Sequence, residues 1–201
     1  MGKKGNFDYL YNGQIAVDAD NQIIVVQHLS WNAKDKKEMG SAIKNIQETT
    51  GTLPSKLSID NGYMSGENLE ALETANLDAY VATNKGGKKN KIPLNESNRN
   101  LAKADFIYNE QDDYFTCPGG QNLVLKNESK DDKKTYQGSC DVCAACDYKS
   151  RCCKSEKGQA CTINTDVFEP LRQQMNEKME SETSKKIYGK QKLLLNLCLD
   201  R

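Results

Sequence analysis

Hydrophobic and polar positions follow regular periods mainly in the first part of the chain. Residues 11–17 and 22–29 are rich in Ile and Val, and the polar residues 18–21 between them have the composition of a turn. This pattern predicts an antiparallel hairpin. A stripe of apolar side chains at helical spacing then predicts a helix over residues 34–48; it consists of Met39, Ala42, Ile43 and Ile46.

A second strand, helix and strand follow. Residues 57–60 have the composition of a short buried strand that ends in Asp60, and Asn61-Gly62 indicates a sharp turn. Ser65 is a suitable cap for the next helix, and residues 77–82 form the next predicted strand. Such a crossover unit is parallel and right-handed. The predicted class is α/β, in the order strand, strand, helix, strand, helix, strand.

The character of the chain changes from residue 85. Residues 85–105 are a basic polar linker, residues 106–162 are rich in cysteine, and residues 163–201 contain a predicted helix at 167–179 and a tail. Lysines in the glycine-containing loop at 85–91 are candidates for following a nucleic-acid backbone: Lys85, Lys88, Lys89 and Lys91. The alternative is an ordinary solvated loop.

Composition adds limits to this picture. The 201 residues contain 28 basic and 28 acidic side chains, so net charge does not draw the chain toward nucleic acid. No apolar run approaches the roughly 20 residues of a membrane helix. We therefore expect a cytoplasmic protein without membrane contact. In that compartment the eight cysteines favour metal-binding thiolates over disulfides.

The cysteines are closely spaced. Cys140, Cys143 and Cys146 stand three residues apart, with Cys152 and Cys153 shortly after them. Such intervals let one turn supply two metal ligands, and Cys117 could return across a hairpin to complete four. Tetrahedral zinc is the expected ion. The alternative is a group of reduced, partly buried thiols.

Asp60 is the other candidate for chemistry. A carboxylate at the carboxyl end of a buried strand, before a glycine turn and a helix, lies where open α/β proteins place their sites. It could hold a divalent metal ion. The alternative is an aspartate that only organises the turn.

Several segments together resemble the DDE transposases of bacterial insertion sequences. Residues 60–69 are similar to the segment around the family's second catalytic aspartate, residues 11–18 to its Tyr-Asn-x-Gln strand, and residues 78–82 to the strand after the helix. Residues 114–120 and the later cysteines are similar to its C-terminal part. The resemblance implies a ribonuclease H-like core in which three acids hold two Mg²⁺ ions for DNA cleavage and strand transfer in transposition.

The resemblance also assigns individual residues. Asp60 is the second acid and a ligand of Mg²⁺, and the implied zinc ligands are Cys117, Cys143, Cys146 and Cys152. The first acid belongs on a strand before residue 11, so we expect a chain that is truncated at its N-terminus. The core of residues 1–84 then lacks its first strand, and copies of the chain could associate through the exposed edge.

The third acid is expected after the pattern at residues 187–192, where Leu193, Leu194 and Leu195 stand instead. We therefore expect a degenerate C-terminus. Glu169 precedes the matching position and is not assigned as a substitute. The prediction is a transposase fragment that acts on the DNA of transposon ends as a family but is inactive as this chain. The main alternative is a non-catalytic, zinc-stabilised module for nucleic-acid binding or protein interaction; a hydrolase using Asp60 with Asp18 or Asp20 is disfavoured, because both lie in a turn.

Overall fold

The computed structural model describes residues 11–83, 94–96, 98–153 and 159–199, with the side chains of Asn95 and residues 192–199 outside the description. The chain divides into two compact units. Unit 1 comprises residues 1–82 and 177–201, and unit 2 comprises residues 83–176. The lysines predicted to contact nucleic acid at 85, 88, 89 and 91 lie outside the described residues.

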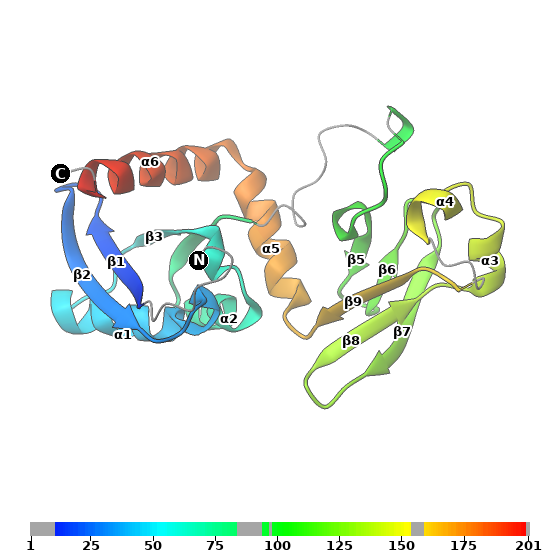
Figure 1. The fold of residues 1–201 in the computed structure, drawn as a ribbon, viewed down its shortest axis with the longest axis horizontal. Coiled ribbons are helices and arrows are strands. Elements are labelled where there is room, and N and C mark those ends of the chain that lie inside the picture. The colour runs from blue at the N-terminus through cyan, green and yellow to red at the C-terminus, as the bar shows by residue number, and fades with distance from the viewer. Residues whose placement is uncertain (1–10, 84–93, 97, 154–158, 200–201) are drawn as a thin grey trace, which may run out of the picture. The chain divides into compact units, whose positions relative to one another are not determined.

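Unit 1 contains the predicted order of elements (Figure 1). Strands β1 (Asn12–Asp18) and β2 (Ile23–Ser30) form the expected antiparallel hairpin, with a register shift between Ala16 and Val17. Strands β3 (Lys56–Ile59) and β4 (Asp78–Val81) pair in parallel, as the crossover argument predicts. Each pair is a separate two-stranded sheet among the described residues.

Helices α1 (Met39–Thr50) and α2 (Gly66–Thr74) also follow the prediction, although α1 begins later than residue 34. A 3-10 turn, η1 (Asp35–Lys37), replaces the expected first turn. The reason is local: the buried Glu38 carboxylate accepts hydrogen bonds from Ser30 Oγ at 2.8 Å and Asn32 Nδ2 at 2.5 Å, which fixes the chain where the helix would otherwise continue.

The cap of α2 is confirmed. Ser65 Oγ accepts a hydrogen bond from the Asn68 N–H at 3.3 Å, and Leu69 and Leu72 are buried. The core of unit 1 is completed by apolar side chains from α1, β3 and β4, namely Met39, Ile46, Ile59, Ala79 and Val81.

The tail of unit 1 differs from the prediction. Helix α6 (Glu182–Leu199) continues through the Leu-rich segment, where no helix is predicted, and it packs against β3 and β4. No helix in the described part of the chain combines the length and the apolar character needed to cross a membrane.

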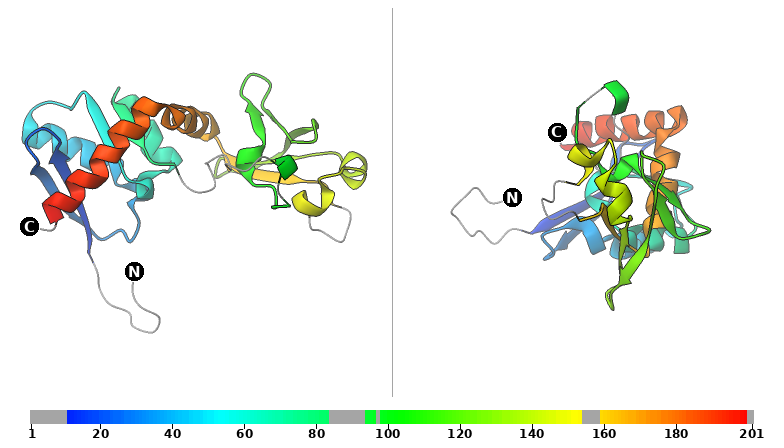
Figure 2. Two further views of the ribbon diagram at one scale, coloured as in Figure 1. Left: turned by 90° about the horizontal axis from the view of Figure 1, so that it is seen from above. Right: turned by 90° about the vertical axis from the view of Figure 1, so that its right-hand side faces the viewer.

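Unit 2 is built on an antiparallel sheet of five strands in sequence order (Figure 1 and Figure 2). Its strands are β5 (Ile107–Asn109), β6 (Tyr114–Thr116), β7 (Asn122–Glu128), β8 (Lys133–Gln137) and β9 (Thr162–Asp166). Short helices α3 (Cys140–Ala144) and α4 (Lys149–Cys152) carry Cys140, Cys143 and Cys152. Helix α5 (Glu169–Glu180) lies close to the predicted 167–179.

The core of unit 2 gathers aromatic and sulfur-bearing side chains. Phe115 and Tyr136 are fully buried and meet edge to face, with ring centroids 5.0 Å apart. Leu123, Ile163 and Cys161 pack in the same cluster. The core therefore reaches directly to the cysteine-bearing segments.

Candidate active site and candidate metal centre

Asp60 lies at the carboxyl end of β3, where the parallel β3–β4 pair ends. Its side chain is exposed, and its Oδ1 accepts a hydrogen bond from the Gly62 N–H at 2.9 Å, capping the 3-10 turn η2 (Asn61–Tyr63). The turn-organising role is therefore present in the structure. The Gly62 N–H occupies one oxygen of the Asp60 carboxylate, and the carboxylate remains exposed to solvent.

A second carboxylate, Asp35 of η1, lies beside the same turn. Its Oδ1 accepts hydrogen bonds from Asn12 Nδ2 at 2.7 Å and Gln14 Nε2 at 2.8 Å. Its Oδ2 is 2.6 Å from the point where a Cβ on Gly62 would lie, so only glycine fits there without moving Asp35. Asp35 is not among the residues predicted from sequence. The signal for it is the pair of polar residues at alternate positions of β1, Asn12 and Gln14, which need a polar partner.

The acids of this region share a neighbour in Tyr63. Burial, and then the carboxylates of Asp35, Glu38 and Asp60, raise the pKa of the Tyr63 phenol well above its ordinary value. The phenol is therefore neutral at physiological pH and can act only as a hydrogen-bonding group. Three carboxylates thus lie near the Tyr63 side chain.

Helix α6 passes close to Asp60. Gln191 Oε1 accepts a hydrogen bond from Ser58 Oγ of β3 at 2.8 Å. Burial, and then the Asp60 carboxylate, raise the pKa of Tyr188. The acid of α6 is Glu182, an exposed residue of the first turn that pairs with Lys185 at 2.7 Å, and the sequence has no other Asp or Glu up to Leu199.

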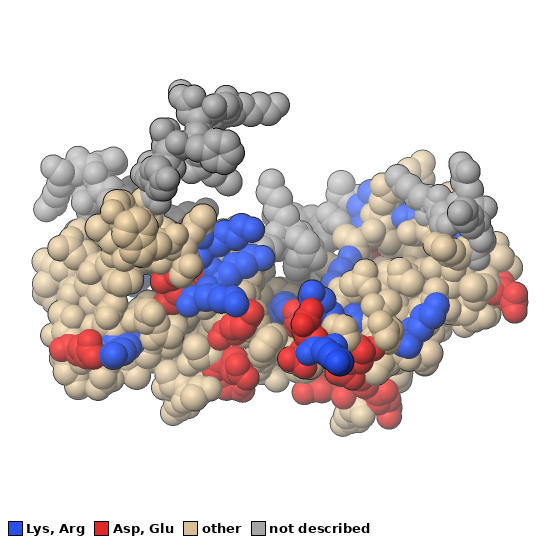
Figure 3. All heavy atoms as spheres, turned by 60° about the horizontal axis from the view of Figure 1, so that its bottom comes forward, with Lys and Arg blue, Asp and Glu red and all other residues tan. Residues whose placement is uncertain are grey.

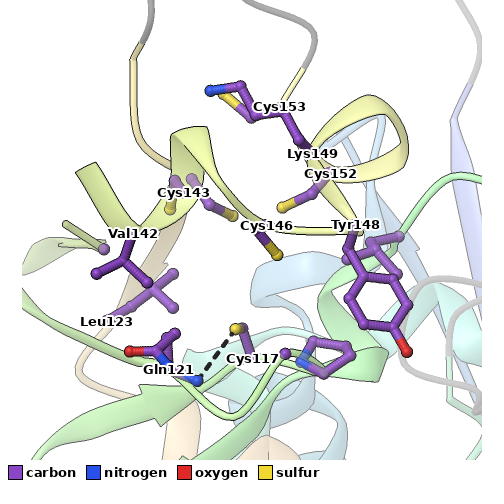
Figure 4. Close-up of a pocket in the computed structure, with 15 residues that line it drawn as sticks. Cys117, Gln121, Leu123, Val142, Cys143, Cys146, Tyr148, Lys149, Cys152 and Cys153 are labelled. Carbon is purple, nitrogen blue, oxygen red and sulfur yellow. Dashed lines mark hydrogen bonds between the residues drawn. The ribbon is translucent and has the colours of Figure 1, made fainter. Parts of the chain in front are cut away.

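The predicted zinc ligands come together in unit 2. Cys117, Cys143, Cys146 and Cys152 line one cavity of about 30 Å³, as do Cys153 and Cys161. Figure 4 shows the sulfurs of Cys117, Cys146 and Cys152 directed into the cavity, whereas that of Cys153 points away. Cys153 Sγ instead donates to the Gln159 carbonyl at 2.9 Å.

Two glycines bring the chain close to these sulfurs. A Cβ on Gly119 would lie 3.3 Å from Cys146 Sγ and 3.6 Å from Cys117 Sγ, and one on Gly138 would lie 3.2 Å from Cys143 Sγ. The Gln121 N–H donates to Cys117 Sγ at 3.4 Å (Figure 4). The backbone therefore approaches the cavity from several sides.

Cys161 is a further sulfur that the sequence left outside the ligand set. It is buried, lines the cavity and hydrogen-bonds with Cys152, and burial raises the pKa of both thiols. Cys140 is exposed and does not line the cavity. Within the described residues, no group of three or more His, Cys, Asp or Glu side chains stands at the spacing of a formed metal site.

Glu169 has a structural role in unit 2. It is 3% exposed, and its Oε2 accepts hydrogen bonds from Lys103 Nζ at 2.5 Å, Thr165 Oγ1 at 2.6 Å and Arg172 Nη1 at 3.2 Å. Every one of these partners comes from unit 2, so Glu169 stabilises that unit.

Residues 116–193 match the family model described as a transposase DDE domain. This segment of the chain is similar to the DDE domain of transposases. No curated protein and no solved structure matched the chain.

The match covers unit 2 from β6 onward and continues into α6. The matched residues include the cysteine-bearing segments of unit 2, α5 and all the described side chains of α6, whereas Asp60 precedes them. Transposases of the DDE family act on DNA and use divalent metal ions, usually Mg²⁺.

Proposed function

We propose that this polypeptide is a DDE transposase relative that binds DNA but does not cleave or join it. The similarity to DDE transposases supports DNA as the partner. The position of Asp60 at the open end of β3, with an exposed carboxylate, supports its assignment as the remaining catalytic acid.

The observation that carries the proposal is the composition of α6. The Ser58–Gln191 hydrogen bond and the closeness of Tyr188 to Asp60 mean that an acid on this helix could reach Asp60. After Glu182, however, the helix has only neutral and basic residues. Helix α6 therefore has no carboxylate that could join Asp60 in binding a metal ion.

The residues present do not fit a two-metal centre. Two divalent cations bridged by acids need several carboxylates to ligate them and to balance their charge. Among the described residues, the other acids close to the turn that Asp60 caps are Asp35 and Glu38. One oxygen of each is already engaged, that of Asp35 by two side-chain amides and that of Glu38 by Ser30 and Asn32. We therefore assign no metal-dependent step to this chain.

A plasmid-nicking assay tests the proposal. The purified chain is incubated with supercoiled DNA and Mg²⁺ or Mn²⁺, beside an Asp60→Asn variant that keeps the size of the side chain. We expect the two proteins to give the same background level of nicked plasmid. Nicking or strand joining that disappears in Asp60→Asn would contradict the proposal.

Unit 2 is proposed to hold a structural zinc ion through Cys117, Cys143, Cys146 and Cys152. Support comes from four sulfurs on one small cavity and from the Gln121 N–H at Cys117 Sγ, a contact that favours a thiolate. The sulfurs must close in to reach the Zn–S distance of about 2.3 Å, and their protons leave as the ion binds. The ion would supply folding energy and no catalysis.

Metal analysis tests this part separately. We expect about one zinc ion per chain after purification under reducing conditions, and well under half of that in Cys117→Ser and Cys146→Ser. Cys140→Ser is the matched control, since Cys140 is exposed and away from the cavity. A metal-free wild-type chain, or an equal loss in Cys140→Ser, would contradict the zinc proposal. The non-catalytic binding or interaction module anticipated from sequence would then lack its zinc.

A further inference from the structure

An exposed aromatic pair lies at the open end of the β1–β2 hairpin. Trp31, the only tryptophan of the chain, is 77% exposed, and Tyr11 is 55% exposed. Their ring centroids are 4.4 Å apart, at a tilt of 54°. A large aromatic face in water gains free energy when another flat ring covers it, so this pair is suited to stacking.

Three lysines follow directly in the chain. Lys34, Lys36 and Lys37 are exposed, and none forms an ion pair with another residue that the structure describes. The two acids between and after them face inward, because Asp35 is bound by Asn12 and Gln14 and Glu38 by Ser30 and Asn32. Positive charge is thereby left on the outer side of this segment. Figure 3 shows basic side chains gathered on the face of unit 1 that it draws.

Hydrogen bonds fix this segment next to Asp60. Asn12 Nδ2 donates both to the Asn32 carbonyl at 3.1 Å, one residue after Trp31, and to Asp35. The other oxygen of Asp35 adjoins Gly62, whose N–H binds the Asp60 carboxylate. Ser65 Oγ also donates to the Lys36 carbonyl at 2.6 Å. The aromatic pair, the lysines and Asp60 therefore belong to one connected end of unit 1.

We infer that Trp31, Tyr11, Lys34, Lys36 and Lys37 form a binding surface for single-stranded DNA beside Asp60. Stacking of an unpaired base on the aromatic pair, with phosphates along the lysines, is the usual physical basis of single-strand binding. The inference rests on the proposed function, because the similarity to DDE transposases is what makes DNA the partner. It names the part of the chain that contacts the DNA strand and the form of DNA that it prefers.

The single tryptophan makes the test direct. Labelled oligothymidylate of about 20 nucleotides is titrated into the full chain, with binding followed by the anisotropy of the label and by Trp31 fluorescence. We expect quenching of Trp31 that parallels the rise in anisotropy, and tighter binding than to a blunt duplex of the same length. Trp31→Ala should weaken binding roughly tenfold, whereas Trp31→Phe should retain most of it.

The lysines are tested through salt dependence. The combined variant Lys34→Ala, Lys36→Ala, Lys37→Ala should reduce the slope of log affinity against log salt by about 2. Its control is Lys126→Ala with Lys130→Ala, which removes exposed lysines of unit 2.

The outcomes separate the two proposals. DNA binding that neither quenches Trp31 nor responds to these variants would overturn the inference and leave the proposed function standing. Equal affinity for the blunt duplex, without quenching, would overturn it as well. Failure of the wild-type chain to bind either DNA at low salt would overturn both.

Discussion

Lys178 Nζ donates a hydrogen bond to Asp78 Oδ1 at 2.6 Å, joining the last turn of α5 to β4 within unit 1. Lys178 Nζ also lies 4.3 Å from the centre of the Tyr80 ring. This hydrogen bond, more than any other effect, lowers the pKa of Asp78 below its ordinary value of 3.8. The pair thus couples the stability of unit 1 to protonation of one carboxylate.

The first prediction concerns Asp78→Asn. Since the folded state depresses the pKa of Asp78, its contribution is present above 3.8 and is lost as the pH falls through the folded pKa. The pair is partly exposed, so we expect Asp78→Asn to cost only about 0.5–1 kcal/mol at pH 7 and less in acid. Urea unfolding at both pH values measures the difference. Asp20→Asn, in the β1–β2 turn, is the control, and a cost for Asp78→Asn that does not change with pH would contradict the prediction.

The second prediction concerns Asp113, which accepts hydrogen bonds from Tyr136 Oη at 2.5 Å and Tyr108 Oη at 2.7 Å. Asp113→Ala leaves both phenols without this acceptor in the core of unit 2. We expect a loss of about 3 kcal/mol, measured by denaturant unfolding. Asp112→Ala, the exposed neighbour, should change stability by less than about 0.5 kcal/mol. Equal effects of the two variants would argue against the network.

The third prediction follows from the same phenols at alkaline pH. Burial raises the pKa of Tyr108 to about 12, and it raises the pKa of Tyr136 further. A phenol whose folded pKa is raised stabilises the fold fully below its ordinary value near 10, and this contribution is lost as the pH rises from there through about 12. Unit 2 should therefore unfold at lower denaturant at pH 11 than at pH 8. Ultraviolet titration that finds every tyrosine ionised near pH 10 in the folded chain would rule this out.

The fourth prediction concerns Gly62→Ala. The new methyl group would lie 2.6 Å from Asp35 Oδ2, so the Asp35 side chain must move. That movement disrupts the hydrogen bonds that Asp35 accepts from Asn12 and Gln14. We expect a loss of about 2 kcal/mol in unfolding free energy. Adding Asp35→Ala should remove most of the further cost of Gly62→Ala, and a double-mutant cycle measures that coupling. Gly40→Ala, where no atom lies within 4 Å, should be neutral or stabilising.

The fifth prediction concerns removal of metal. If zinc binds in the thiol cavity, a chelator should increase amide exchange in α3, α4 and β9 of unit 2. At a structural metal site the free energy of metal binding stabilises the fold, so removing the ion destabilises it. Exchange in α1 and α2 of unit 1 is the internal control. An identical exchange pattern with and without chelator would count against the structural ion.

Strong local patterns made the elements of unit 1 predictable. A few neighbouring residues suffice to predict each of these elements. The signals are the Ile and Val runs of β1 and β2, the apolar stripe of α1 and the Ser65 cap of α2. The strands of unit 2 have weaker local patterns. Strand β8 reads KKTYQ, with Tyr136 as its one fully buried residue, so its pairing depends on neighbours that a local pattern does not include.

In the candidate site too, some residues follow from a local pattern and others only from contacts in the fold. Asp60 could be located because a strand, a turn and a helix follow in order around it. Trp31 and Asp35 precede Met39, where the apolar stripe of the predicted helix begins. Their importance comes from contacts with residues distant in sequence, such as Tyr11, Asn12 and Gly62. Cys161 likewise joins the other sulfurs only because β9 returns alongside β8.

The contrast between Cys140 at the surface and Cys161 in the interior has a practical consequence. Alkylating reagents attack thiols that are exposed and ionised, so Cys140 should be modified well before Cys161. The order in which maleimide adducts accumulate, followed by mass spectrometry, would then serve as a simple measure of the intactness of unit 2 in any preparation.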